Sequence, residues 1–143
     1  MKKKTIIGLG NPLKKDDNIG NLIVDKLKEQ IQGPDYIFIK AGISPENFLV
    51  KIKKQDPDLV LFVDAACFDG TIGEVKLFDI SDMEEYQFST HNIPISLFRE
   101  RLKSIKIIGI KVEDTDFGQG LSKDLQKRFD LIFEAVRSLV ISL

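Results

Sequence analysis

An uninterrupted apolar run in the middle of the chain restricts its fold more than any other feature. The run Leu59-Val60-Leu61-Phe62-Val63 contains no polar residue, so a strand that it forms must be buried on both faces. A central strand of a parallel sheet, covered by helices on both sides, meets that requirement. The run therefore favours an α/β fold.

The segments on either side of this run predict alternating strands and helices. Apolar patterning predicts strands at 4–9, 36–39, 59–63, 74–79 and 106–112. Apolar periodicity, capping residues and proline breaks predict helices at 18–31, 44–56, 93–103 and 122–143. We expect residues 1–143 to form a single domain, a three-layer α/β/α sandwich of the phosphorylase/hydrolase-like type with a mostly parallel, mixed sheet of about five strands.

Composition excludes several classes of protein. With 43% hydrophobic and 30% charged residues the chain is not of a disordered type, and its net charge of −1 gives no sign of a nucleic-acid or anionic-membrane partner. The apolar run behind Lys2-Lys3-Lys4 is too short for a signal peptide, and no segment reaches membrane-spanning length. The single cysteine, Cys67, cannot form an internal disulfide, so we expect a cytoplasmic protein.

The loop after the first predicted strand carries an acidic pair. Gly8-Leu9-Gly10-Asn11-Pro12 has the outline of a phosphate-binding turn, but Asp16-Asp17 follows where such a site needs bare amides and positive charge. The third glycine of a dinucleotide-binding motif is also absent, because Leu13 takes its place. Carboxylates in this position repel anions and attract a cation.

Two further candidate ligands are expected at the same edge of the sheet. Ligands of open α/β sheets bind beyond the carboxyl ends of the strands. Asp64 follows the apolar run directly, and His91 precedes a predicted helix. Two carboxylates and one imidazole at that edge would form a set of two oxygens and one nitrogen with positions left open, which suits a divalent transition metal.

Each of these residues also has a purely structural interpretation. Asp16 or Asp17 fits as a cap at the start of a helix, where a carboxylate stabilises the helix dipole. Asp64 fits as a turn residue at the end of a strand, and a lone histidine such as His91 before a helix is most often structural. Spacing alone leaves both interpretations open.

Several motifs occur together and in one order along nearly the whole chain. They are Gly8-Leu9-Gly10-Asn11, Asp16-Asp17, Gly20, Val63-Asp64-Ala65, Gly73-Glu74-Val75, Thr90-His91-Asn92, Ile108-Gly109-Ile110 and residues 117–122. This combination resembles the hydrogenase maturation endopeptidases, which process the large subunit of [NiFe] hydrogenases. The Thr-His-Asn-Ile-Pro stretch at 90–94 resembles their hydrogenase-3-type branch.

The resemblance implies a substrate and a set of ligands. Asp17, Asp64 and His91 fall where family members place the residues that engage nickel, and that nickel belongs to the substrate. Such enzymes remove a short C-terminal extension from the large-subunit precursor, only after nickel has been inserted. Members are generally monomeric. The expected partner is thus a [NiFe]-hydrogenase large-subunit precursor, with no nucleic acid and no membrane involved.

Three positions depart from the family pattern. Asn18 replaces a common glycine, Ala41 replaces the first of two glycines, and Lys111-Val112 replaces a common Gln-Pro. None of the three is an expected nickel ligand.

The residues also restrict the mechanism. With one histidine, the chain has no credible Ser-His-Asp set and no His-Glu-x-x-His zinc motif. We therefore expect metal-directed cleavage by water, with Asp16 or one of the ligating carboxylates, Asp17 or Asp64, activating the water. Nickel would act either as a Lewis acid or only as a recognition element.

Two other functions fit part of the pattern. A non-proteolytic nickel-sensing or hydrogenase-binding protein would keep the same ligands without cutting. The opening Gly8-Leu9-Gly10-Asn11-Pro12 also resembles that of peptidyl-tRNA hydrolases. Those enzymes need a histidine shortly after this opening, where the present chain has acidic residues.

Overall fold

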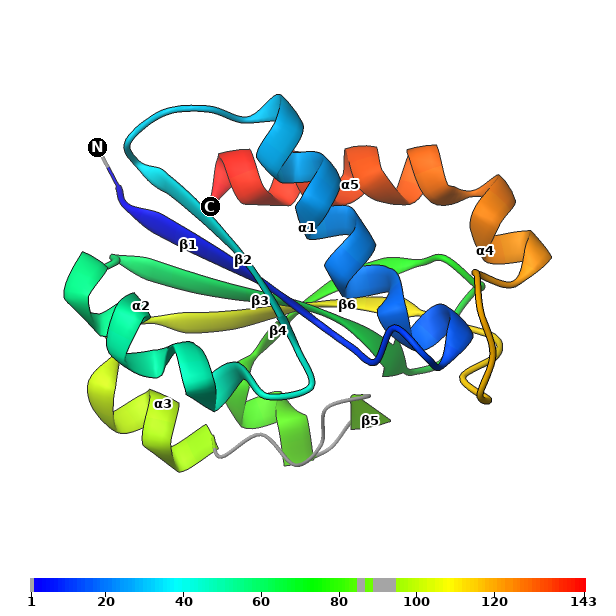
Figure 1. The fold of residues 1–143 in the computed structure, drawn as a ribbon, viewed down its shortest axis with the longest axis horizontal. Coiled ribbons are helices and arrows are strands. Elements are labelled where there is room, and N and C mark those ends of the chain that lie inside the picture. The colour runs from blue at the N-terminus through cyan, green and yellow to red at the C-terminus, as the bar shows by residue number, and fades with distance from the viewer. Residues whose placement is uncertain (1, 85–86, 89–94) are drawn as a thin grey trace.

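The computed structural model describes residues 2–84, 87–88 and 95–143, which form a sheet between two layers of helices (Figure 1). The sheet contains β1 (Lys4–Leu9), β2 (Tyr36–Gly42), β3 (Leu59–Cys67), β4 (Val75–Asp79), β5 (Gln87–Phe88) and β6 (Ile105–Lys111). The α-helices are α1 (Ile19–Gln30), α2 (Leu49–Gln55), α3 (Ile95–Arg101), α4 (Lys123–Lys127) and α5 (Phe129–Ser142). Short 3-10 turns form η1 (Lys15–Asn18), η2 (Pro45–Phe48) and η3 (Ile80–Glu84).

The strand order of the sheet is β2-β1-β3-β6-β4. Its first four strands are parallel, β4 is antiparallel to β6 at one edge, and the short β5 pairs antiparallel with the end of β3. Because β1, β2, β3 and β6 all run in one direction, their carboxyl ends lie along one edge of the sheet. We call this the carboxyl edge.

Two hydrophobic clusters hold the layers together, one on each face of the sheet. Helices α1, α4 and α5 pack on one face, and α2 and α3 on the other (Figure 1). The predicted central strand has the expected burial, since Leu61, Phe62 and Val63 of β3 are all 0% exposed. Parallel strands with both faces covered need such continuous apolar sequence.

A buried lysine joins the first strand to the last helix. The side chain of Lys4 is only 6% exposed, and its Nζ donates hydrogen bonds to the carbonyl oxygens of Val140 (2.7 Å) and Ile141 (3.0 Å). These carbonyls belong to the last turn of α5, where the carbonyl oxygens have no hydrogen-bond partner within the helix. An ammonium group there also stabilises the negative end of the helix dipole.

The sandwich with a mostly parallel, mixed sheet is confirmed, but some predicted element ends are wrong. Strand β3 continues through Asp64 to Cys67 because β6 pairs with it from Val60 to Ala66. Asp64 is therefore inside a strand and is not a turn residue. The helix predicted from Ser122 onward is divided into α4 and α5 at Arg128, whose ψ of 2° departs from helical geometry.

Close packing of α1 on the sheet depends on a glycine in its first turn. A Cβ atom on Gly20 would lie 2.1 Å from the carbonyl oxygen of Val63 and 2.5 Å from that of Leu9. Both oxygens belong to strand backbone, which cannot move aside cheaply. The start of α1 is thereby fixed directly over the ends of β1 and β3.

Replacing Gly20 with alanine should destabilise the protein by about 2 kcal/mol or more, because the added methyl group must push α1 away from the sheet. At an ordinary helical position a glycine-to-alanine change would stabilise the protein by roughly 1 kcal/mol. The sign of the change in unfolding free energy therefore tests the close packing by itself. Urea unfolding followed by circular dichroism measures it. Lys28→Ala, at an exposed position of the same helix, should change stability by less than about 0.5 kcal/mol.

Candidate active site

Asp16 connects two loops of the carboxyl edge that are far apart in the sequence. Its side chain is 0% exposed. Oδ2 accepts hydrogen bonds from the backbone N–H groups of Glu113 (3.1 Å) and Asp114 (3.0 Å) and from the hydroxyl of Ser122 (2.8 Å). Oδ1 accepts a bond from the backbone N–H of Ser122 (2.6 Å). One carboxylate thus holds the loop after β1 against the segment that joins β6 to α4.

Further contacts tie the same two loops together. Gly118 N–H donates to the Leu13 carbonyl (2.9 Å), and Lys15 N–H donates to the Gly118 carbonyl (3.2 Å). Lys15 Nζ lies 2.9 Å from Asp114 Oδ2. This hydrogen bond is the main cause that raises the pKa of Lys15 and also the main cause that lowers the pKa of Asp114. Both groups therefore stay charged near neutral pH.

Asn21 forms a second buried bridge, toward β2. Its Nδ2 donates to the carbonyl of Gly10 and to Oδ1 of Asn18, both at 2.9 Å, and its Oδ1 accepts from Gly42 N–H at 3.3 Å. Asn18, which replaces the common glycine of the family, is therefore part of this network. The bridge fixes the loop after β1 against the end of β2.

Asp17 is placed by the loop that Asp16 and Asn21 hold. Its side chain is 8% exposed, and its Oδ2 accepts a hydrogen bond of 2.8 Å from the backbone N–H of Asn11. A Cβ atom on Gly10 would lie 1.8 Å from the Asp17 carbonyl oxygen, so only glycine permits this tight approach. Neither Asp16 nor Asp17 caps the helix α1, whose N-cap position is Asn18 with no side-chain capping bond.

Asp64 lies on the neighbouring strand at the same edge. It is 1% exposed and faces Gly109 of β6 in the sheet register. It directly follows Val63, whose carbonyl contacts Gly20, three residues after Asp17. The turn η1, which contains Asp17, also contacts β3. The fold therefore brings two buried carboxylates to one edge of the sheet.

His91, the predicted third ligand, lies outside the described residues, as do Thr90 and Asn92 of the same motif. Within residues 2–84, 87–88 and 95–143, no group of three or more His, Cys, Asp or Glu side chains is arranged to hold a metal ion. Of the three predicted nickel ligands, the structure therefore describes the two carboxylates, Asp17 and Asp64.

Three residues of this edge have structural roles that sequence analysis missed. Ser122 is at the N-cap position of α4 but makes no side-chain capping bond, and its hydroxyl donates to Asp16. The only sign of Asn21 in the sequence is that it is a polar residue on the apolar face of a predicted helix. Lys111, one of the departures from the family pattern, donates a short hydrogen bond from Nζ to the carbonyl of Phe68, just after β3.

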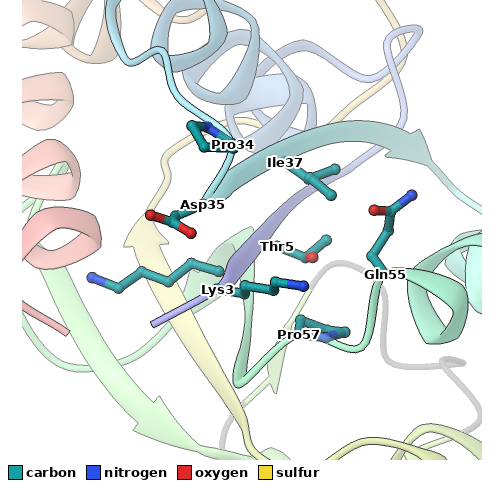
Figure 2. A pocket seen from close by; sticks show the side chains of 8 residues that line it. Lys3, Thr5, Pro34, Asp35, Ile37, Gln55 and Pro57 are labelled. Atoms are coloured by element: carbon teal, nitrogen blue, oxygen red, sulfur yellow. The ribbon is translucent and has the colours of Figure 1, made fainter. Parts of the chain in front are cut away.

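A small cavity lies at the opposite edge, beside the amino ends of β1 and β2 (Figure 2). Its volume is about 40 Å³, enough for one or a few water molecules. The buried Oγ1 of Thr5, on its wall, has no protein hydrogen-bond partner among the described residues. The cavity is remote from the acidic pair and belongs to no predicted site.

The fold is an open α/β sheet, and ligands of such sheets bind beyond the carboxyl ends of the strands, the edge at which the two buried carboxylates lie. The family model for hydrogenase maturation proteases of the HycI type matches residues 22–139. The chain belongs to this family and is a peptidase.

Relatives and solved structures agree with this assignment. A protein of Methanocaldococcus jannaschii assigned to the same family is 37% identical over 128 residues, covering 81% of this chain and 76% of that protein. The hydrogenase 3 maturation protease of Escherichia coli K12 is 25% identical over 134 residues, covering 90% and 85%. The crystal structure of the [NiFe] hydrogenase maturation protease HycI from Thermococcus kodakarensis has 27% identity and a TM-score of 0.79, covering 97% and 92%.

The part of the chain that the structure describes contains no helix long and apolar enough to cross a membrane.

Replacing Asp16 with alanine should destabilise the protein by about 3 kcal/mol, because the change leaves buried N–H and hydroxyl donors without an acceptor. Thermal and urea unfolding measure the loss. Asp116→Ala removes an exposed carboxylate from one of the same loops and should change stability by less than about 0.5 kcal/mol. Equal stability of the two variants would contradict the bridging role of Asp16.

Proposed function

We propose that this peptidase removes the C-terminal extension of a [NiFe]-hydrogenase large-subunit precursor after nickel has been inserted. The observation that carries the proposal is the pair of buried carboxylates, Asp17 and Asp64, at one edge of the sheet. The names of the relatives support the class of substrate, since the E. coli relative is a hydrogenase 3 maturation protease. The nickel ion arrives with the substrate.

The roles that we propose follow from the chemistry of the donors. Asp17, Asp64 and His91 together supply two carboxylates and one imidazole, which suit a divalent transition metal with positions left for the substrate. Carboxylates attract a cation, and exclusion of water at a buried site strengthens that attraction, so an incoming metal ion is a favourable partner for Asp17 and Asp64. Binding of substrate nickel would then fix the peptide bond beside these side chains.

The hydrogen bonds of Asp16 favour a positioning role over activation of water. Both of its carboxylate oxygens accept hydrogen bonds from loop groups, with three on Oδ2 and one on Oδ1. A general base needs an oxygen that can reach the attacking water. We therefore assign activation of water to Asp17 or Asp64 and propose that Asp16 holds the Asp17 loop in place.

The proposal also includes the oligomeric state, the compartment and the partner of the enzyme. We propose that the enzyme works as a monomer in the cytoplasm and that its partner is the precursor protein. The single cysteine, Cys67, which is exposed at the end of β3, is compatible with a reducing compartment.

Substitution of the three proposed ligands tests this function. Purified nickel-loaded precursor is incubated with Asp17→Asn, Asp64→Asn or His91→Ala enzyme, and intact mass spectrometry follows loss of the extension. We expect each change to slow processing at least about a hundredfold, because it removes a ligand that positions the substrate. Asp124→Asn, at an exposed position of α4, should process at the wild-type rate.

The same assay separates the remaining alternatives. If wild-type enzyme binds the precursor and leaves its mass unchanged, the protein is a binder and not a protease for this substrate. If the His91→Ala enzyme cleaves nickel-free precursor, nickel acts as a checkpoint only. Normal processing of nickel-loaded precursor by all three variants would overturn the proposed ligand set.

A further inference from the structure

Two large apolar side chains, Leu13 and Phe117, are exposed at the carboxyl edge. Leu13 is 62% exposed and Phe117 is 76% exposed. They come from the two loops that Asp16 joins, one after β1 and the other after β6. We propose that this apolar pair is a docking surface for the substrate protein and contacts apolar side chains near the bond that is cut. The inference rests on the proposed function.

The backbone brings Leu13 and Phe117 to neighbouring positions. Lys14 and Gly118 form a parallel bridge, so the preceding residues, Leu13 and Phe117, are neighbours in the same register. Two backbone hydrogen bonds flank this bridge, from Gly118 N–H to the Leu13 carbonyl and from Lys15 N–H to the Gly118 carbonyl. The position of the pair is therefore fixed by backbone hydrogen bonds between the two loops.

Charged neighbours hold the pair in position. Lys14 Nζ lies 4.9 Å from the centre of the Phe117 ring, within the range of a cation–π interaction. The Lys15–Asp114 ion pair and the Asp16 hydrogen bonds tie the loops on either side. The backbone that carries Leu13 and Phe117 is thus already ordered, so binding of a partner costs little loop entropy, which favours affinity.

The location of the pair identifies its occupant. Single exposed apolar residues are common on protein surfaces, and Leu131 of α5 is one, at 75% exposed. The pair differs because Leu13 lies on the loop that leads directly into Asp16 and Asp17, and Phe117 lies on the loop that is hydrogen-bonded to it. A peptidase must lay a polypeptide across its site, so the surface beside the acidic residues meets the substrate chain on either side of the cut bond. An apolar segment of that chain would cover Leu13 and Phe117.

The double variant Leu13→Ser/Phe117→Ser tests the docking surface. We expect KM for nickel-loaded precursor to rise about tenfold or more, because burial of two large apolar side chains against the substrate is lost. The value of kcat should stay within about twofold, because neither side chain is proposed to touch the nickel or the cut bond. Binding of nickel-free precursor, measured by calorimetry, should weaken by a similar factor.

Two control variants separate docking from folding effects. Leu131→Ser removes an equally exposed apolar side chain from α5 and should leave KM unchanged. Leu13→Met/Phe117→Leu keeps the apolar character and should retain affinity within about threefold. Unchanged melting temperatures show that each variant is folded. If the double serine variant melts early, the single variant Leu13→Ser decides, since it leaves the contact between Lys14 and the Phe117 ring in place.

The outcomes distinguish this inference from the proposed function. If the wild-type enzyme cleaves the precursor and the serine variants show an unchanged KM, the docking surface is overturned and the proposed function stands. If the wild type binds without cleaving, and the serine variants bind more weakly, the docking surface stands and the proteolytic function fails. If the wild type neither binds nor cleaves the precursor, both are overturned.

Discussion

The arrangement of the candidate site depends on one fully buried carboxylate, that of Asp16. Asp16 accepts four hydrogen bonds from residues that follow it by about a hundred positions in the chain. Burial of a carboxylate is unfavourable unless such donors surround it, so the loop after β1 and the segment after β6 must fold together. Asp17, the next residue, takes its position from that constraint.

We propose that the two adjacent aspartates of the acidic pair have different roles. Asp16 is fully buried and joins the two loops, whereas Asp17 and Asp64 both lie at the carboxyl edge, where ligands of α/β sheets bind. Close backbone packing makes this division possible. Gly10 and Gly20 allow the loop and the first turn of α1 to press against neighbouring backbone at distances that a side chain would prevent.

Much of the fold was predictable because its signals are local. The apolar run 59–63 predicted a central strand, and amphipathic spacing predicted α1 and the C-terminal helical region. The continuation of β3 through Asp64 was missed, because it depends on pairing with β6 more than forty residues later. The interruption at Arg128 was missed too, since the apolar periodicity runs through both helices.

The sequence by itself determined the class of fold, the family, and the acidic residues available to bind a cation. Apolar periodicity and short motifs are local properties, so they can be recognised from the sequence alone. Only the tertiary structure showed that Asp16 joins two loops, because its hydrogen-bond donors come from Glu113, Asp114 and Ser122. The adjacency of Leu13 and Phe117 was likewise settled by long-range pairing, which no local pattern encodes.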